Sequence, residues 1–237
     1  MVLDANLSPA VVRALSGLTT AHAVPLFYEP TSDHKCALAL GFTGGDSSTN
    51  SGGGMEVLRR IDVIKPNAAE LCRLLWAVTK EGDGGLNMRE KHTLKRALAE
   101  LDGLGAYGAS SDLDLEDLEL LGSALHRMMA QCNDKEIGEG EEEEKGEKKS
   151  KDKHVLASLG SRGVLWISDG GVELVPALPV EVEGGNQFNT NGCGDALMAG
   201  VVAGSIRRGG VDVEVVREGV KEAYLHIMQS KSAQPRN

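Results

Sequence analysis

The chain alternates between short apolar runs and longer stretches in which apolar residues recur every three or four positions. Runs of the first kind predict buried strands, and stretches of the second kind predict helices with one apolar face. The predicted strands are residues 2–4, 24–28, 61–64, 155–159, 164–168 and 172–175. The predicted helices are residues 11–18, 31–40, 68–75, 94–101, 118–128, 196–206 and 213–228, and residues 41–54 are predicted to form a loop.

The first part of the chain alternates predicted strands with predicted helices, which indicates an α/β fold. Strands joined through helices favour right-handed crossovers, and therefore a mainly parallel sheet with helices on both faces. Sheets of this kind bind ligands at the edge formed by the carboxyl ends of their strands. We therefore expect the chemistry of this protein at that edge.

The segment from residue 133 to residue 153 differs in composition from the rest of the chain. Residues 139–153 consist almost entirely of Glu, Lys, Gly and Ser. Because such a segment has no apolar side chains to place in a core, we predict a disordered insertion there. A solvated loop accounts for this composition, and an acidic docking segment is the functional alternative.

Composition and charge narrow the class of protein. The 237 residues, 41% of them hydrophobic, suffice for one domain with a filled core. A net charge of -10 and 3% aromatic residues disfavour binding to a nucleic acid polymer and favour a small-molecule substrate. No stretch predicts a membrane span or an export signal. The four cysteines are too scattered for a zinc site or a disulfide framework, so we expect a cytoplasmic protein without membrane contact.

Candidate chemistry concentrates just before the predicted helix that begins at residue 196. Gly192, Cys193 and Gly194 are small, so their backbone N–H groups are accessible at a helix N-terminus, where an anion is favoured. Asp195 follows directly and could accept a proton from a hydroxyl. These residues suit phosphoryl transfer, with the N–H groups stabilising the transferred phosphate and Asp195 acting as base. The alternative is an aspartate that only stabilises the start of its helix.

The segment from Asn189 to Gly200 resembles the second signature of the PfkB carbohydrate kinases, the ribokinase-like family. That signature runs Asp-Thr-x-Gly-Ala-Gly-Asp and continues into a helix of small residues; Thr190, Gly192, Gly194 and Asp195 occupy its fixed positions here. Cys193 replaces the usual small residue, which favours a packing role for its thiol over a nucleophilic one. The resemblance implies a ribokinase-like three-layer sandwich, of which residues 1–237 form the C-terminal part.

Two further segments resemble motifs of the same family, in the same order. Asn67 and Glu70 match its Asn-x-x-Glu motif, which implies that they position Mg²⁺ and the nucleotide phosphates, with Glu70 holding the metal through water. Read alone, the pair predicts a helix cap. Ser158, Gly160 and Gly163 match the strand and turn that contact the ATP phosphates in relatives, although in isolation they predict a simple hairpin.

The resemblance also suggests ligands and a branch of the family. Its implied cofactors are ATP and Mg²⁺, it allows a monovalent cation such as K⁺, and it assigns Thr190 to the nucleotide. The segments 24–33 and 224–235 are similar to those of pseudouridine kinases. By that similarity, the substrate would be a nucleoside or sugar, and the reaction would convert pseudouridine to pseudouridine 5'-phosphate.

Full-length members of the family carry a further segment, with a Gly-Gly signature and most of the sugar contacts, before the point at which this chain begins. We therefore expect a domain that is truncated at its N-terminus. Two functions stay open: an ATP-dependent kinase, and a catalytically inactive remnant that binds nucleotide or a partner. A dinucleotide-binding oxidoreductase is disfavoured because no Gly-x-Gly-x-x-Gly follows the first strand.

Overall fold

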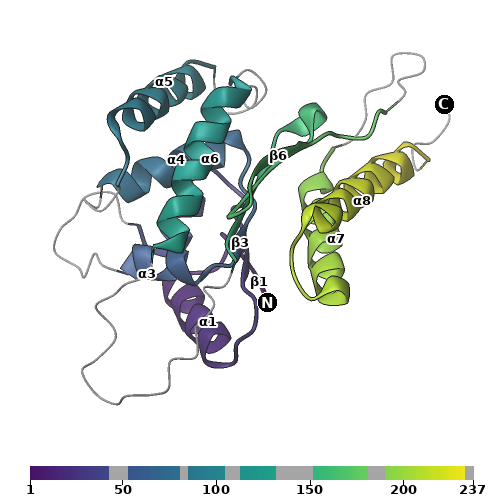
Figure 1. Ribbon diagram of the computed structural model, residues 1–237, viewed down its shortest axis with the longest axis horizontal. Helices are drawn as coiled ribbons and strands as arrows, with labels where there is room; N and C mark the ends of the chain where they lie inside the picture. Colours follow the sequence, from purple (N-terminus) through teal and green to yellow (C-terminus); the bar gives the residue numbers. More distant parts are fainter. Residues whose placement is uncertain (43–52, 81–84, 105–112, 132–151, 181–189, 233–237) are drawn as a thin grey trace.

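The computed structural model describes residues 1–42, 53–80, 85–104, 113–131, 152–180 and 190–232. These residues form a six-stranded sheet between layers of helices (Figure 1). None of the helices in these ranges is long and apolar enough to cross a membrane.

The sheet is mixed, and its strands lie side by side in chain order. They are β1 (Val2–Asp4), β2 (Phe27–Glu29), β3 (Val63–Ile64), β4 (His154–Ser158), β5 (Val164–Ser168) and β6 (Gly171–Val175). The first four strands are parallel, whereas β4 pairs with β5, and β5 with β6, in the antiparallel sense. The carboxyl ends of β2, β3 and β4 therefore meet at one edge of the sheet.

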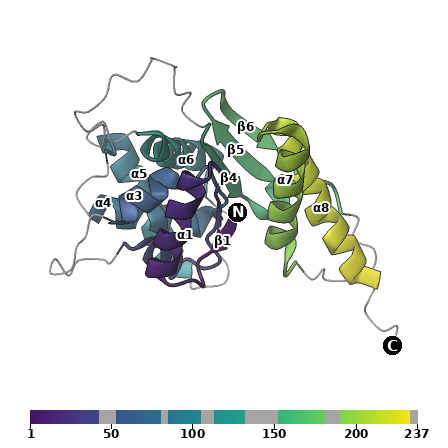
Figure 2. The same ribbon diagram turned by 90° about the horizontal axis from the view of Figure 1, so that it is seen from below.

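Helices cover the two faces of the sheet unequally. One side carries α1 (Pro9–Ala21), α2 (Cys36–Leu40), α3 (Gly53–Arg60), α4 (Ala68–Lys80), α5 (Met88–Leu104) and α6 (Leu115–Ala130). The other side carries α7 (Cys193–Arg208) and α8 (Val213–Ser232). Figure 2 shows the sheet between these two layers, so the predicted α/β fold with helices on both faces is confirmed.

The core is divided by the sheet because alternate residues of a strand point to opposite faces. Tyr28 and Ile64 belong to the larger cluster, with the buried residues of α1 to α6. Phe27 and Val63 belong to the smaller cluster, with those of α7 and α8. The same alternation directs Glu29, which follows Tyr28, and Lys65, which follows Ile64, toward α7. These two residues form the centre of the site described below.

The chain between β2 and β3 differs from the sequence prediction. Of the predicted helix 31–40, only Cys36–Leu40 is helical, and Gly41 ends it with φ of 97°. Helix α3 begins at Gly53, inside the predicted loop 41–54; residues 43–52 lie outside the described part. A Cβ on Gly54 would lie 2.7 Å from the Phe42 ring. Gly54, which lies in the predicted loop, therefore allows close packing against Phe42.

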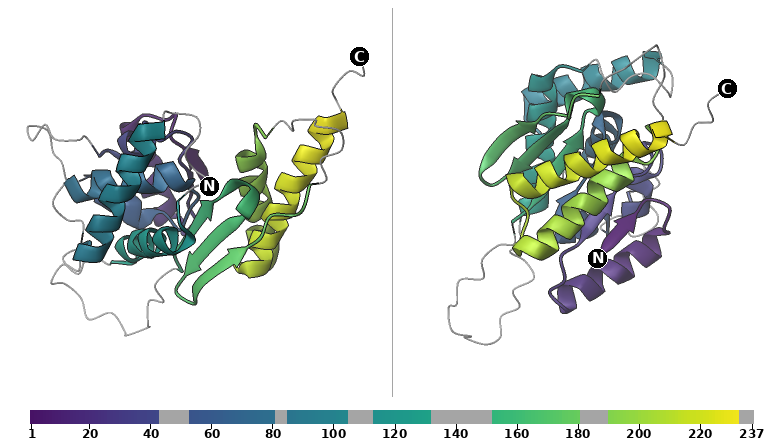
Figure 3. Two further views of the ribbon diagram at one scale, coloured as in Figure 1. Left: turned by 90° about the horizontal axis from the view of Figure 1, so that it is seen from above. Right: turned by 90° about the vertical axis from the view of Figure 1, so that its right-hand side faces the viewer.

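Helices α7 and α8 run side by side in very close contact (Figure 3). A Cβ on Gly200 would lie 2.7 Å from Cα of Gly219, and a Cβ on Gly219 would lie 2.8 Å from the carbonyl oxygen of Leu197. Real side chains do not tolerate such distances, so both glycines are required for this contact. Val216 and Val220, on the predicted apolar face of the last helix, are buried beneath it.

The predicted insertion at 133–153 falls almost entirely on residues 132–151, outside the described part of the chain. Lys153, the last residue of that range, is buried. Its Nζ donates to the carbonyl oxygen of Ile61 at 2.8 Å and to Oδ1 of Asp62 at 3.2 Å. Lys153 thus fixes the start of this part of the chain next to the amino ends of β3 and β4.

Candidate active site

Polar residues gather at the carboxyl edge of the parallel strands. Glu29 is the last residue of β2, Lys65 directly follows β3, and Ser158 is the last residue of β4. Asn67 pairs with Ser158 through an isolated parallel bridge, and the N–H of Ser158 donates to the carbonyl of Pro66 at 2.8 Å. Two motifs that lie far apart in the sequence therefore meet at this edge.

Lys65 and Glu29 form a buried ion pair on the face of the sheet that carries α7. Nζ of Lys65 lies 2.7 Å from Oε1 of Glu29, and the two side chains are 4% and 12% exposed. Burial raises the pKa of Glu29, Lys65 opposes this shift, and the charge of Asp195 adds to it. Oε2 of Glu29 is buried without a hydrogen-bond partner among the described residues. Such an oxygen marks a polar site that a further group would complete.

The start of α7 is built on an unusual turn. Gly192, the N-cap, has φ of 84°, which favours glycine, and it has no side chain that could accept from the first-turn N–H groups. The first intrahelical bond runs from the N–H of Ala196 to the carbonyl of Gly192 at 2.9 Å. Helix geometry leaves the preceding N–H groups without a carbonyl inside the helix.

The three predicted anion-binding N–H groups are not equivalent. The N–H of Cys193 donates to the carbonyl of Thr190 at 3.2 Å, so it would have to exchange this bond to contact a phosphate. Burial raises the pKa of the Cys193 thiol, which supports the packing role over a nucleophilic one. Asp195 and Thr190 are exposed, and Asn189 lies outside the described residues.

Gly194 places the first turn of α7 against the ion pair. A Cβ on Gly194 would lie 3.2 Å from Nζ of Lys65 and 3.8 Å from Oε1 of Glu29. The absence of a side chain at this position therefore lets the helix start approach the two charges. A cation and a positive helix terminus at one point favour an anion there.

Asn67 and Glu70 form a reciprocal cap at the start of α4. The N–H of Asn67 donates to Oε2 of Glu70 at 2.8 Å, and the N–H of Glu70 donates to Oδ1 of Asn67 at 2.9 Å. Asn87 and Glu90 repeat the same geometry at the start of α5, at 2.8 and 3.0 Å. The Asn-x-x-Glu pattern therefore has a capping function at both places, and only the first lies at the carboxyl edge.

Glu70 differs from an ordinary surface carboxylate. It is 5% exposed, and this burial raises its pKa to about 7, against the opposing effects of the Asn67 N–H and Lys65. The charges of Glu29 and Asp33 raise it further. Ionisation of Glu70 is therefore less favourable than that of a surface carboxylate, and a nearby cation would favour it.

The loop after β4 separates the roles of its two glycines. Gly160 has φ of 59° and open space around its Cα, whereas Gly163 has φ of 106° and would place a Cβ 2.1 Å from the carbonyl oxygen of Val175. The hydroxyl of Ser158 donates to the carbonyl of Pro66 at 3.5 Å. Gly163 thus serves the hairpin that joins β4 and β5, and Gly160 is the glycine that is accessible to a ligand.

The predicted Mg²⁺ site fits only a hydrated ion. No three His, Cys, Asp or Glu side chains of the described ranges are arranged to hold a metal together. One oxygen of Glu70 already accepts from Asn67, and Oε2 of Glu29 lacks a partner among those residues. Mg²⁺ keeps several waters and binds one or two carboxylates, so contact through water suits this donor set.

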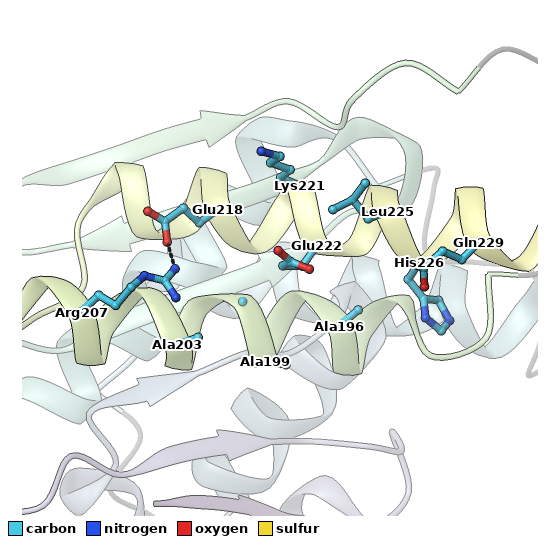
Figure 4. A pocket seen from close by; sticks show the side chains of 11 residues that line it. Ala196, Ala199, Ala203, Arg207, Glu218, Lys221, Glu222, Leu225, His226 and Gln229 are labelled. Atoms are coloured by element: carbon cyan, nitrogen blue, oxygen red, sulfur yellow. Dashed lines mark hydrogen bonds and ion pairs between the residues drawn. The ribbon is translucent and has the colours of Figure 1, made fainter.

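A groove of about 600 Å³ runs between α7 and α8 (Figure 4). Its floor consists of small residues of α7, including Ala199 and Ala203, and its rim carries Lys221 and Glu222 of α8. The His226 ring reaches from α8 toward the start of α7 at one end of the groove. Asp195, Lys65 and Glu29 do not line the groove, whereas Ala196, in the first turn of α7, does.

The central ion pair was not predicted from the sequence. Neither Lys65 nor Glu29 belongs to the residues that the sequence motifs single out. Their positions could have indicated them, because both residues lie at the carboxyl ends of buried strands, where sheets of this kind bind ligands.

Known proteins resemble the part of the chain that contains the loop after β4 and the start of α7. Residues 125–236 match the model of the pfkB family carbohydrate kinases. The pfkB match includes Ser158, Gly160 and the turn before α7, and it does not include Asn67 or Glu70. A 1-phosphofructokinase of Haloferax volcanii is 43% identical over 70 residues, which cover 30% of this chain and 21% of that protein.

Solved structures share the fold over nearly the whole chain. An Anopheles gambiae adenosine kinase in complex with P1,P4-di(adenosine-5) tetraphosphate has a TM-score of 0.59 at 17% identity and covers 100% of this chain. An Arabidopsis thaliana ribokinase complexed with ribose and ATP has a TM-score of 0.54 at 16% identity and covers 96%. The chain spans 53% and 49% of these two structures, about half of their length. These two kinases therefore share the fold of this chain, a sheet between two layers of helices.

Proposed function

We propose that this chain forms the nucleotide-binding and catalytic part of an ATP-dependent kinase that phosphorylates a primary hydroxyl of a ribosyl compound. Asp195 lies in the first turn of α7, and Gly194 of that turn lies against the buried pair of Lys65 and Glu29 at the carboxyl edge. A base, a positive helix terminus and a buried cation then lie together where an α/β sheet binds its ligands.

Asp195 acts as the base. Its exposed carboxylate accepts the proton of the acceptor hydroxyl as the hydroxyl oxygen attacks the γ-phosphorus of ATP. The bond between this phosphorus and the bridging oxygen breaks, and ADP leaves. The N–H groups of Gly192, Cys193 and Gly194 donate to the oxygens of the transferred phosphate, with Cys193 first releasing Thr190. Stabilising charge that develops during the reaction is the main task of the protein in this chemistry.

The phosphates would extend along the carboxyl edge from α7 to the loop after β4. Ser158 and Gly160 contact them on that side, and Asn67 supports the bridge to Ser158. Mg²⁺, when bound, neutralises phosphate charge. Glu70 and Glu29 would hold it through water. Gly163 enters the proposal only as the residue that shapes the loop.

Pseudouridine is the proposed acceptor, on the similarity of residues 24–33 and 224–235 to pseudouridine kinases. The solved structures with the same fold include an adenosine kinase in complex with adenosine and a ribokinase with ribose and ATP. These compounds share a ribosyl group with a primary hydroxyl. A competition among pseudouridine, adenosine and ribose therefore tests the choice of acceptor separately from the chemistry.

Release of ADP from ATP, Mg²⁺ and each acceptor tests the proposal, with K⁺ present and absent. Asp195→Asn is expected to lower kcat by about 10²–10⁴-fold, because the amide cannot accept the proton. Asp212→Asn is the matched control. Asp212 is the aspartate at the start of α8, where its Oδ1 accepts from the N–H of Val215 at 2.9 Å. It should lower stability and leave kcat unchanged.

The outcomes separate the two candidate functions. Equal kcat values for the wild type and Asp195→Asn would show that Asp195 only stabilises its helix. Binding of ATP without turnover of any acceptor would favour the alternative, a catalytically inactive remnant that binds nucleotide.

A further inference from the structure

A histidine of the last helix contacts the turn that precedes α7. Nε2 of His226 lies 2.8 Å from the carbonyl oxygen of Asn191. A carbonyl oxygen only accepts hydrogen bonds, so Nε2 carries the proton and donates. The contact joins residues 35 positions apart in the chain. It therefore connects α8 directly to the turn that aims the first N–H groups of α7.

The same ring also packs against the next residue of the turn. A Cβ on Gly192 would lie 3.0 Å from Nε2 and 3.2 Å from Cε1 of His226. Gly192 has φ of 84°, so its backbone conformation depends on the absence of a side chain at this position. The imidazole thus both bonds residue 191 and covers residue 192, which fixes the turn from one side.

Helix α8 is a firm support for this ring. Gly200 and Gly219 bring the backbones of α7 and α8 together, and Val216 and Val220 hold α8 against the sheet. Figure 4 shows the ring of His226 extending from α8 at the end of the groove nearest to Ala196, in the first turns of α7. A side chain on a closely packed helix is suited to hold a neighbouring turn in one position.

We propose that His226 is a positioning residue that holds the 190–192 turn so that the N–H groups at the start of α7 point at the transferred phosphate. This inference rests on the proposed function. The bonded form needs a donor at the place of Nε2, and both neutral and protonated imidazole supply it. In this proposal His226 donates a hydrogen bond to the turn and takes no proton from the substrate.

Two substitutions separate the hydrogen bond from the bulk of the ring. His226→Gln keeps an N–H donor at a similar reach, and His226→Leu keeps apolar volume without a donor. His126 provides the matched control, because its Nε2 lies 2.8 Å from the carbonyl oxygen of Lys153, next to the amino ends of the strands. The pair His126→Gln and His126→Leu therefore changes the same kind of bond away from α7.

Hydrogen exchange of the backbone N–H groups, followed by NMR, tests the positioning without any assay of activity. His226→Leu is expected to speed exchange of the N–H groups of Cys193 and Ala196, which donate to Thr190 and Gly192, by at least about tenfold, because the turn loses its anchor. His226→Gln should retain the wild-type rates there, and neither His126 variant should change them. Unchanged exchange at these residues in His226→Leu would overturn the proposal.

Kinetics test whether the positioning matters for transfer. His226→Leu is expected to lower kcat by roughly 10–100-fold with a smaller change in KM for the acceptor, and His226→Gln should restore most of the loss. Equal kcat in all three proteins would also overturn the proposal. A wild-type chain without turnover would contradict the proposed kinase function instead, and His226 would then be judged by hydrogen exchange alone.

Discussion

Nζ of Lys65 lies 2.7 Å from Oε1 of Glu29, next to the position that a side chain on Gly194 would take. Two opposite charges with almost no access to water need each other, because each would be costly to bury alone. The pair therefore keeps a cation available at the start of α7 before any phosphate arrives. Its energetics can be tested separately from catalysis.

Replacing Lys65 with Met should destabilise the protein in a pH-dependent manner. Glu29 would lose the cation that opposes the rise of its pKa, so this pKa would rise further. A carboxyl with a raised pKa in the folded state loses stability as pH rises from its unfolded value toward its folded value. We expect Lys65→Met to lose about 3–5 kcal/mol of unfolding free energy at pH 8, and less at pH 5, in urea denaturation.

Arg217 supplies the control for that experiment. It pairs with Glu173 at 3.1 Å, but the two side chains are 51% and 43% exposed. Arg217→Met should therefore lose no more than about 1 kcal/mol. Equal losses for Lys65→Met and Arg217→Met would show that burial does not strengthen the Lys65 pair.

The two Asn-x-x-Glu caps allow capping to be separated from ligand binding. Asn67→Ala and Asn87→Ala each remove an acceptor for a first-turn N–H, so each should lower the unfolding free energy by about 1 kcal/mol. Only Asn67 lies next to Ser158 at the carboxyl edge. Calorimetric titration with ATP and Mg²⁺ should therefore show weaker binding for Asn67→Ala alone. Equal affinities in the two variants would limit Asn67 to a capping role.

Glu70→Gln should change how stability depends on pH. The pKa of Glu70 is raised from 4.5 to about 7, so its ionisation removes stability between these two values. The amide introduced by this substitution keeps an acceptor for the Asn67 N–H and does not ionise. We therefore compare the unfolding free energy of the variant minus that of the wild type at two pH values. This difference is expected to be roughly 2 kcal/mol more positive at pH 8 than at pH 5. Parallel curves would contradict a raised pKa.

The two loop glycines should respond differently to alanine. Gly163→Ala would place a Cβ 2.1 Å from a backbone oxygen at φ of 106°, so the β4–β5 hairpin would have to move. Gly160→Ala meets nothing within 4 Å and carries only the strain of φ at 59°, about 1–2 kcal/mol. Thermal unfolding should show the larger loss for Gly163→Ala. The opposite order would mean that the loop adapts freely.

Periodicity predicted most of the fold because buried strands and one-sided helices leave strong local patterns. The pattern around Val164–Ser168 matches β5 residue for residue. The segment from Thr31 to Gly54 was predicted less well, because glycine signals both turns and close packing. Gly53 and Gly54 start a helix whose crowding against Arg13 and Phe42 is a tertiary property.

The candidate site was predictable where a motif is contiguous. Gly192 to Asp195 lie together in the sequence and at the start of α7. The ion pair could not be read in this way, because Lys65 and Glu29 meet only when β2 and β3 become neighbours. The contact of His226 with Asn191 likewise depends on how α8 lies against α7.

The direct contact between Gly200 and Gly219 also limits how this half of the molecule can move. A layer of leucines between two helices would let them slide by changes of rotamer. Two backbones in direct contact have no side chains between them that could rearrange in this way. Helices α7 and α8 should therefore move as one rigid unit against the sheet. Any widening of the carboxyl edge that admits an acceptor must then tilt both helices together, or come from movement of the residues that face them across this edge.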